Sequence, residues 1–289
     1  MTKTESLKNL VKISNKIGEN LGFIQVGGGN TSVKFGPRSM AVKSSGSLLS
    51  DMTLGNGYCV VDYRSINDYL NNPDDNEDEF VLKIRSLVIE TNNRPSMETG
   101  FHSILGKFVL HTHSVYTNVI TCCSEGKSIS KKLLPSSIWV NYHSPGKELI
   151  LAVQAKIKSD IKKTQIIFLQ NHGIIISASN PEEVIDVHSQ VNKEAMDLLK
   201  LDEFGVLEDL EKIPKQNILF PDQVVYTLSD ISLLQTEGAK EIMSAYSYIL
   251  RGIEKNSLSP RFLSKQEVST IQEMESEKFR QEVFKNDVN

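Results

Sequence analysis

The sequence of 289 residues lacks any apolar run that approaches the roughly 18–20 residues needed to cross a bilayer. Its first residues, MTKTESLKNLVKISNKIG, are polar and patterned like a helix, with no apolar signal core. The basic residues form no stripe, and the net charge of -4 argues against general nucleic-acid binding. These absences predict a cytoplasmic protein that binds neither membranes nor nucleic acid.

Cysteine is also scarce, with only Cys59, Cys122 and Cys123. Three cysteines are too few for a disulfide framework, and the adjacent pair could bond only through a strained ring. We therefore expect reduced thiols in the core. The 39% hydrophobic and 24% charged residues match an ordinary globular protein, which excludes general disorder and collagen-like repeats.

The periodicity of apolar residues predicts alternating strands and helices. Strands are expected at 32–35, 40–46, 58–63 and 107–114, and as a pair over 164–179 that breaks at 171–173. Helices are expected at 5–21, 96–105, 146–163 and 181–199, with a helix and then a loop over 117–133 and an acidic loop at 71–78.

The pattern changes near residue 205, which we take as a domain boundary. Residues 1–205 would form the catalytic domain, and residues 206–289 a C-terminal extension that is first extended and then helical. The extended part is expected at 213–230, followed by a helix at 240–253 and one charged terminal helix at 264–284.

Two of the six histidines, His111 and His113, are separated by one residue in an apolar strand, so both side chains project from one face. Such a pair can bind a single metal, and His172, between two apolar runs, can direct a third nitrogen into the same cleft. Three histidines with an open position form the catalytic type of zinc site. On the pattern alone, the pair can equally be core histidines satisfied by backbone groups.

Glu98 lies thirteen residues before His111, at the start of a predicted helix. There a carboxylate can be a metal ligand, a general base or both, or simply a surface residue that interacts with the helix dipole. The segment GGGNTS (27–32) is either a tight turn or part of a phosphate site. With KSSG (43–46) and Ser96 it would offer backbone N–H groups and hydroxyls to a phosphate.

Five motifs together resemble those of the class II aldolase/adducin family, over roughly residues 5–200. They are GGGNTSVK (27–34), KSSG (43–46), PSMETGFH (95–102), HTHS (111–114) and QNHG (170–173). The likeness is greatest to the branch that contains rhamnulose-1-phosphate aldolase-like domains. The resemblance implies an α/β/α sandwich around a mixed, mainly antiparallel sheet, and a homotetramer with sites between subunits.

The resemblance also implies roles for individual residues. His111, His113 and His172 would bind one Zn²⁺ per subunit, and Glu98 would be the catalytic acid/base. The substrate phosphate would be held by four residues: Asn30, Ser45, Gly46 and Ser96.

Other residues of these segments receive different interpretations. Met97 departs from the family's common Pro-Ser-Ser-Glu pattern and removes one hydroxyl from the phosphate site. His102 fits its motif, and we favour a structural role for it. His143 and His188 are expected on the surface or on a helix face. Three tyrosines are assigned to packing rather than catalysis: Tyr142, Tyr226 and Tyr246.

The resemblance predicts a zinc-dependent aldolase, a lyase that cleaves a ketose phosphate or related sugar by a retro-aldol reaction through a metal-stabilised enediolate. Three alternatives stay open. Pentulose-phosphate 4-epimerases of this family share the metal but typically carry aspartate at the position of Glu98. A metal-dependent decarboxylase of a 3-oxo sugar-acid phosphate would keep the glutamate. A non-catalytic adducin-like interaction domain would typically lack the complete histidine set.

Overall fold

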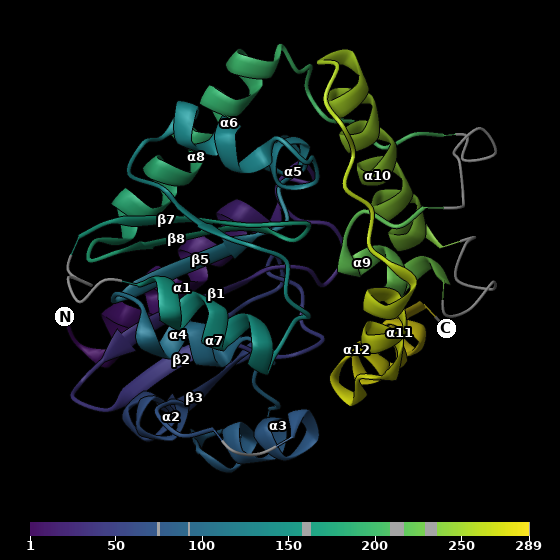
Figure 1. The fold of residues 1–289 in the computed structure, drawn as a ribbon. Helices are drawn as coiled ribbons and strands as arrows, with labels where there is room; N and C mark the ends of the chain where they lie inside the picture. The colour runs from purple at the N-terminus through teal and green to yellow at the C-terminus, as the bar shows by residue number, and fades with distance from the viewer. Residues whose placement is uncertain (74–75, 92, 158–162, 209–216, 229–235, 289) are drawn as a thin grey trace.

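One mixed sheet of eight strands organises the protein, seen in a computed structural model that describes residues 1–289 except 74–75, 92, 158–162, 209–216, 229–235 and 289 (Figure 1). The strands follow the order β4-β3-β2-β1-β5-β8-β7-β6, and only β6 and β7 are parallel neighbours. Their bounds are β1 Asn30–Phe35, β2 Ser39–Lys43, β3 Tyr58–Asp62, β4 Val88–Glu90, β5 Phe108–Thr112, β6 Ile138–Val140, β7 Gln165–Leu169 and β8 Gly173–Ala178.

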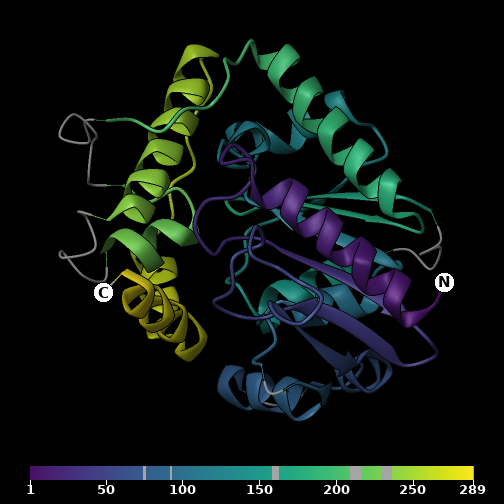
Figure 2. The ribbon, with the colours of Figure 1, turned by 180° about the vertical axis from the view of Figure 1, so that it is seen from behind.

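Helices cover both faces of this sheet (Figures 1 and 2). One face packs against α2, α3, α4 and α7, and the other against α1 and the beginning of α8. The helices are α1 Lys3–Gly18, α2 Tyr63–Leu70, α3 Glu77–Ser86, α4 Thr99–Ile104, α5 Val115–Thr121, α6 Gly126–Leu133, α7 Lys147–Lys156 and α8 Pro181–Leu199. The expected α/β/α sandwich around a mainly antiparallel sheet is therefore confirmed.

The central strands are buried on both sides, which explains why they read as continuous apolar runs. β5 pairs with β1 and β8, so His111 lies between Asn30 and Ile175 in the sheet register. The centre of the sheet therefore fixes the backbone of a candidate site residue on both sides.

The C-terminal part of the chain forms a further group of helices at one end of the sheet, where Figures 1 and 2 place α9, α10, α11 and α12 together. Its elements are α9 Pro221–Gln223, a π-helical turn η1 Val224–Leu228, α10 Glu237–Lys255, α11 Lys265–Glu273 and α12 Glu275–Val288. Helix α10 packs on α5, and η1 packs on α11 and α12. This group shares a continuous core with α5 and most of α8.

Several predicted elements differ from the structure. Part of the extended segment expected at 213–230 is helical (221–228), because Pro221 begins a helix at a position where its missing N–H costs nothing. The expected loop at the end of 117–133 is α6, and the single terminal helix is two helices separated at Met274, which adopts an extended backbone conformation. Residues 213–216 and 229–230 of the segment expected to be extended lie outside the described residues.

Two further boundaries shift. The helix expected at 96–105 begins only at Thr99, which leaves Glu98 at the N-cap position. The helix expected at 146–163 ends at Lys156, and 158–162 lie outside the described residues. Helix α8 follows the prediction, since the side chain of Asn180 accepts from the Glu182 N–H at 2.9 Å.

The three cysteines are free and buried. Burial raises the pKa of Cys59 and Cys123 to about 12, and that of Cys122 still further, so all three stay protonated at neutral pH. This agrees with their assignment as core thiols. Within the described ranges, no helix combines the length and the apolar character required to span a membrane.

Candidate active site

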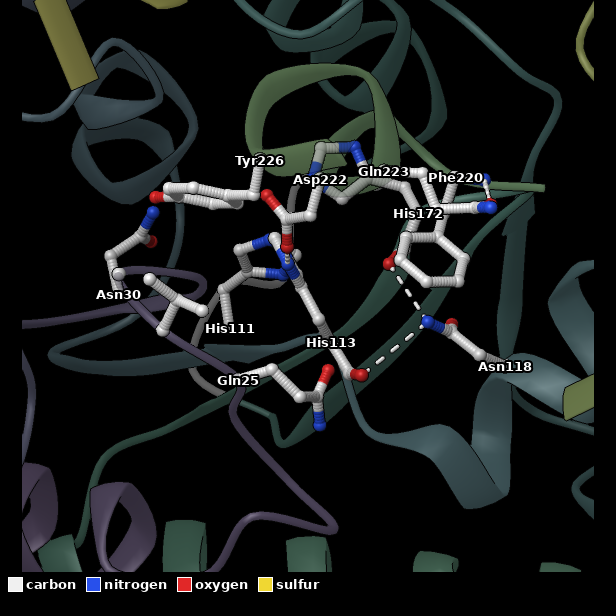
Figure 3. A network of polar contacts seen from close by, with 12 residues as sticks. Gln25, Asn30, His111, His113, Asn118, His172, Phe220, Asp222, Gln223 and Tyr226 are labelled. Carbon is white, nitrogen blue, oxygen red and sulfur yellow. Dashed lines mark hydrogen bonds and ion pairs between the residues drawn. The ribbon is translucent and has the colours of Figure 1, made fainter. Parts of the chain in front are cut away.

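Three histidine side chains converge where β5 ends beside the β7–β8 turn (Figure 3). His111 lies in β5, His113 just beyond it, and His172 in the turn. One ring nitrogen of each lies within 4.8 Å of the others, and all three side chains are buried. The structure thus brings together the three histidines that the sequence singled out.

The conformation of the turn that carries His172 depends on the residues on either side of this histidine, Asn171 and Gly173. Asn171 adopts a left-handed backbone conformation (φ 54°), which asparagine tolerates better than most residues. Its side chain donates to the carbonyl oxygens of Leu219 and Arg261 at 2.7 and 2.6 Å. A Cβ on Gly173 would lie 2.1 Å from the carbonyl oxygen of Thr112, so only glycine lets the turn approach β5 this closely.

Hydrogen bonds fix the orientation of two of the rings. Nδ1 of His111 lies 3.0 Å from the carbonyl oxygen of Ile174, and Nδ1 of His113 contacts the carboxylate of Asp222. Both partners accept, so each Nδ1 carries the proton and each Nε2 presents a lone pair. These two Nε2 atoms are 3.1 Å apart, a repulsive arrangement that a cation between them would relieve.

Burial keeps two of the three histidines, His111 and His172, neutral. It lowers the pKa of His111 to about 4 and that of His172 to about 3, which outweighs the opposing influence of the nearby Glu98 carboxylate. Neutral imidazoles are the form that binds a metal ion. The charge state of these rings at neutral pH therefore suits a metal centre.

The carboxylate of Glu98 lies beside the histidine cluster. Oε1 is 3.2 Å from Nε2 of His172, and Oε2 is 3.6 Å from Nε2 of His111. Burial acts to raise the pKa of Glu98, but these imidazoles and a hydrogen bond from Asn30 hold the pKa below its ordinary value. Glu98 is therefore ionised at neutral pH, although it is only 6% exposed.

Asn30 and His102 support this carboxylate. The amide of Asn30 donates to Oε2 of Glu98 at 2.8 Å, and its oxygen contacts Nε2 of His102. The other ring nitrogen of His102 lies 2.7 Å from the hydroxyl of Ser32, and burial lowers the pKa of this histidine to about 3. Since His102 touches Asn30 rather than the histidine cluster, its contacts agree with the expected structural role.

A cavity of about 30 Å³ lies against the cluster, with room for one or two water molecules. Its walls contain all four residues assigned to a phosphate from the sequence, together with Met97 and Glu98. The four are Asn30, Ser45, Gly46 and Ser96. The Ser96 hydroxyl accepts from Asn30 and from the Glu98 N–H, both at 3.3 Å, and its own O–H has no acceptor among the described residues.

Four charged residues of the cavity were not identified from the sequence. Lys43 is buried, and its amine donates to the carbonyl oxygen of Gly27 at 3.2 Å, while burial lowers its pKa to about 7. Asp222, Glu277 and Arg280 enter the cavity wall from α9 and α12. Lys43 belongs to the KSSG motif and could have been singled out, whereas the other three belong to no motif.

The three tyrosines that the sequence analysis assigned to packing, Tyr142, Tyr226 and Tyr246, lie outside the cavity wall. Tyr226 and Tyr246 are buried in the C-terminal core, and the Tyr226 hydroxyl accepts from Arg280 at 3.2 Å. The ring of Tyr142 lies under the guanidinium of Arg261, 4.8 Å away. These contacts agree with packing roles.

Two residues beneath the site hold the backbone of the histidine cluster. The Asn118 amide donates to the carbonyl oxygens of His113 (3.4 Å) and His172 (3.2 Å), as Figure 3 shows. Nε2 of His188 lies 2.9 Å from the hydroxyl of Thr112. His188 is on a helix face as expected, but it is fully buried, so the surface alternative is wrong.

The burial of His188 predicts a loss of stability in acid. Its pKa is lowered from 6.5 to about 3, so the unfolded chain binds the proton more readily, and stability falls as the pH drops from 6.5 toward 3. Between pH 7 and 5 this group should cost at most about 2 kcal/mol. Urea unfolding at pH 7 and pH 5 measures this effect. Between these pH values, the free energy of unfolding should fall less in His188→Gln than in the wild type, and an equal fall in both proteins would contradict the interpretation.

Comparisons with known proteins agree with this geometry. The family model described as the class II aldolase and adducin N-terminal domain matches residues 8–197. The chain is 30% identical over 184 residues to the uncharacterized oxidoreductase YuxG of Bacillus subtilis (strain 168), a match that covers 59% of this chain and 26% of that protein. The chain thus spans about a quarter of the length of this curated relative.

Solved structures share the fold. The N-terminal class II aldolase domain of a conserved protein from Thermoplasma acidophilum superimposes with a TM-score of 0.61 and 25% identity, over 67% of this chain and 93% of that one. YgbL of Klebsiella pneumoniae, a putative aldolase/epimerase/decarboxylase, superimposes with a TM-score of 0.50 and 15% identity. That second match covers 94% of this chain and 99% of the other, and at this identity it concerns the fold alone.

Proposed function

Because the chain belongs to the class II aldolase and adducin family, we propose that it is a zinc-dependent aldolase that cleaves a ketose phosphate or related sugar by a retro-aldol reaction. The observation that carries this proposal is the convergence of three buried histidines beside a buried glutamate. The name of the B. subtilis relative is not carried over, because this chain matches about a quarter of that protein.

The donor set fits a divalent cation. His111 and His113 present lone pairs to one another at 3.1 Å, and Oε1 of Glu98 accepts no hydrogen bond among the described residues. Three imidazoles leave a coordination position for substrate, which is the catalytic form of a zinc site. When bound, the metal would act as a Lewis acid on the negative charge that develops on the substrate oxygens.

Within this proposal, Glu98 moves the proton. Asn30 fixes one carboxylate oxygen, while the other faces the cavity side of the histidine cluster. A carboxylate held in this way can accept a proton from the cleaving substrate and return one to the carbon that loses its bond, as general acid/base catalysis requires. The ionised state of Glu98 at neutral pH suits the accepting step.

The phosphate of the substrate is assigned to the part of the cavity wall that contains Ser45, Gly46 and Ser96. Ser45 and Gly46 lie in a loop where Gly46 has a φ of 82°, and the Ser96 hydroxyl has its proton left to donate. Lys43 adds a buried amine to this wall, and its pKa of about 7 leaves it partly protonated at neutral pH, which compensates for the hydroxyl that Met97 removes. An anionic substrate group is therefore favoured at this end of the cavity.

Replacing Ser45 or Ser96 with alanine should raise KM for a phosphorylated substrate about 10- to 100-fold, because a hydrogen bond to a charged group is lost. The measurement is steady-state kinetics with a phosphorylated substrate and its unphosphorylated analogue. Ser47→Ala, which changes a neighbouring serine outside the cavity wall, is the matched control. An unchanged preference between the two substrates in both variants would rule out the phosphate assignment.

Residues argue against two of the three alternative functions, and an experiment must decide the third. Glu98 favours the aldolase over the pentulose-phosphate 4-epimerase, and the complete histidine cluster disfavours a non-catalytic adducin-like domain. A decarboxylase of a 3-oxo sugar-acid phosphate would keep the glutamate, so product analysis must separate it from the aldolase.

The oligomeric state is a separate part of the proposal. We propose a homotetramer from the family resemblance, and light scattering coupled to gel filtration tests it.

Metal dependence provides the first test of the function. Removal of divalent metal with a chelator should abolish turnover, and stoichiometric Zn²⁺ should restore it, because the proposal assigns the stabilisation of the developing charge to the metal. Full turnover by metal-free protein would refute the proposal.

A further inference from the structure

The three histidines differ in what holds their second ring nitrogen. Nδ1 of His111 faces a neutral carbonyl, and Nδ1 of His172 has no hydrogen-bond partner among the described residues. Within this cluster, only His113 has its Nδ1 against a carboxylate, that of Asp222. His113 is therefore the one member of the cluster whose Nδ1 is held by a charged acceptor.

This support comes from a distant part of the sequence. Asp222 lies in α9, 109 residues after His113, and its side chain is 1% exposed. Figure 3 shows the carboxylate of Asp222 directed at the His113 ring. A carboxylate that accepts from Nδ1–H fixes the tautomer and ring orientation of a histidine ligand and raises its basicity.

Arg280 in turn holds Asp222. Its Nη2 donates to Oδ1 of Asp222 at 3.0 Å and to the hydroxyl of Tyr226 at 3.2 Å, while Nη1 donates to Glu277 at 2.8 Å. Each oxygen of Asp222 thus accepts from a different residue: Oδ2 from His113 and Oδ1 from Arg280. The side chain of Arg280 is 14% exposed, so water screens this ion pair only weakly.

Helix α12, which carries Arg280, is docked onto the candidate phosphate loop. Glu275 pairs with Arg94, and a Cβ on Gly46 would lie 2.9 Å from Val283. Phe284 packs on the ring of Tyr226, with ring centroids 5.2 Å apart. These contacts fix the position of α12 relative to the histidine cluster.

We propose that Asp222 is the positioning residue for His113, and that Arg280 locks Asp222 in place, so that α9 and α12 set the affinity of the three-histidine site for a divalent cation. This inference rests on the proposed metal site, and it adds two residues that belong to none of the five motifs. Neither residue need touch the substrate. Both act through the orientation of one imidazole.

The test is the dissociation constant for Zn²⁺, measured on the full-length, metal-free protein by competition with a chromophoric chelator. Asp222→Asn keeps the size of the side chain and removes its charge, and it should weaken zinc binding about 10- to 100-fold. Arg280→Gln should weaken binding by a smaller factor, and Arg280→Lys should recover part of the loss because it restores the charge without the fork of donors.

Two exposed residues provide matched controls. Asp186→Asn removes a carboxylate from α8, and Lys278→Gln removes a positive charge from α12 two residues before Arg280. Both should bind zinc as the wild type does. The far-UV circular dichroism and melting temperature of each metal-free variant check the fold, and Arg280→Gln provides a second variant if Asp222→Asn does not fold.

A double variant tests whether the two residues act in sequence. Since Arg280 acts through Asp222, Arg280→Gln should add little to the loss caused by Asp222→Asn. The absorption spectrum of the Co²⁺-substituted protein should shift in Asp222→Asn, because the ligand field at His113 changes, which a purely structural role would not cause.

Specific results would overturn the inference. A folded Asp222→Asn variant with wild-type zinc affinity excludes the positioning role, and a fully additive double variant excludes the role of Arg280. Failure of the wild type to bind zinc would instead refute the proposed function, so the two failures are distinguishable.

Discussion

Replacing Glu98 with glutamine should lower turnover by about 10²–10⁴, the usual contribution of a positioned acid or base, while leaving zinc bound. The substitution keeps the size of the side chain and its hydrogen bond from Asn30, but it removes the carboxylate that accepts the proton. The three histidines still hold the metal. The expected result is therefore a metal-loaded protein with little activity.

Metal content and turnover must be measured on the same sample to interpret this variant. Glu254→Gln, a substitution of an exposed glutamate on α10, controls for the change of charge. Full activity in Glu98→Gln would leave Glu98 without a chemical role. Loss of zinc together with activity would make it mainly a ligand or a structural support.

Replacing His111 or His172 with alanine should remove most of the bound zinc. Loss of a residue that is hydrogen-bonded to a metal ligand already changes affinity about 10- to 100-fold, and loss of one of three direct ligands should exceed this range. Each substitution also leaves a void at a buried position, although His113 keeps its contact with Asp222 in both variants. Turnover should disappear with the metal.

Elemental analysis after dialysis without chelators measures this effect. His143→Ala, which removes a histidine outside the cluster, should retain the zinc content of the wild type. Stoichiometric zinc in His111→Ala or His172→Ala, or a wild type without a divalent metal, would contradict the three-histidine site.

The fold class could be predicted because the signals for it are local. Continuous apolar runs marked β5, β7 and β8, and the sequence Asn180-Pro181 with two glutamates marked the start of α8. The break at Asn171-His172-Gly173 was visible because asparagine and glycine supply the backbone conformation and the close approach that this turn requires.

Where the predictions failed, weak local signals were overridden by packing. Helix α6 is short, and its sequence GKSISKKL is polar, so the chain there reads as a loop. The break at Met274 is not marked by glycine or proline, and α11 and α12 therefore read as one helix. The packing of both helices against η1 accompanies the bend.

The candidate site could be predicted only in part. The histidines, Glu98 and the phosphate loop belong to compact motifs, and the sheet register brings Asn30 beside His111. Asp222 and Arg280 could not be identified, because neither belongs to a motif and each lies more than one hundred residues after His113. Only the packing of α9 and α12 at the end of the sheet places them there.

The most direct test of the central claim is to identify the reaction products by NMR. The zinc-loaded protein is incubated with a panel of ketose 1-phosphates and 3-oxo acid phosphates. The proposal predicts zinc-dependent cleavage of a ketose 1-phosphate between C3 and C4, with dihydroxyacetone phosphate and an aldehyde in equal amounts. An epimer with an intact carbon chain, release of carbon dioxide from the 3-oxo acids alone, or cleavage without metal would contradict it.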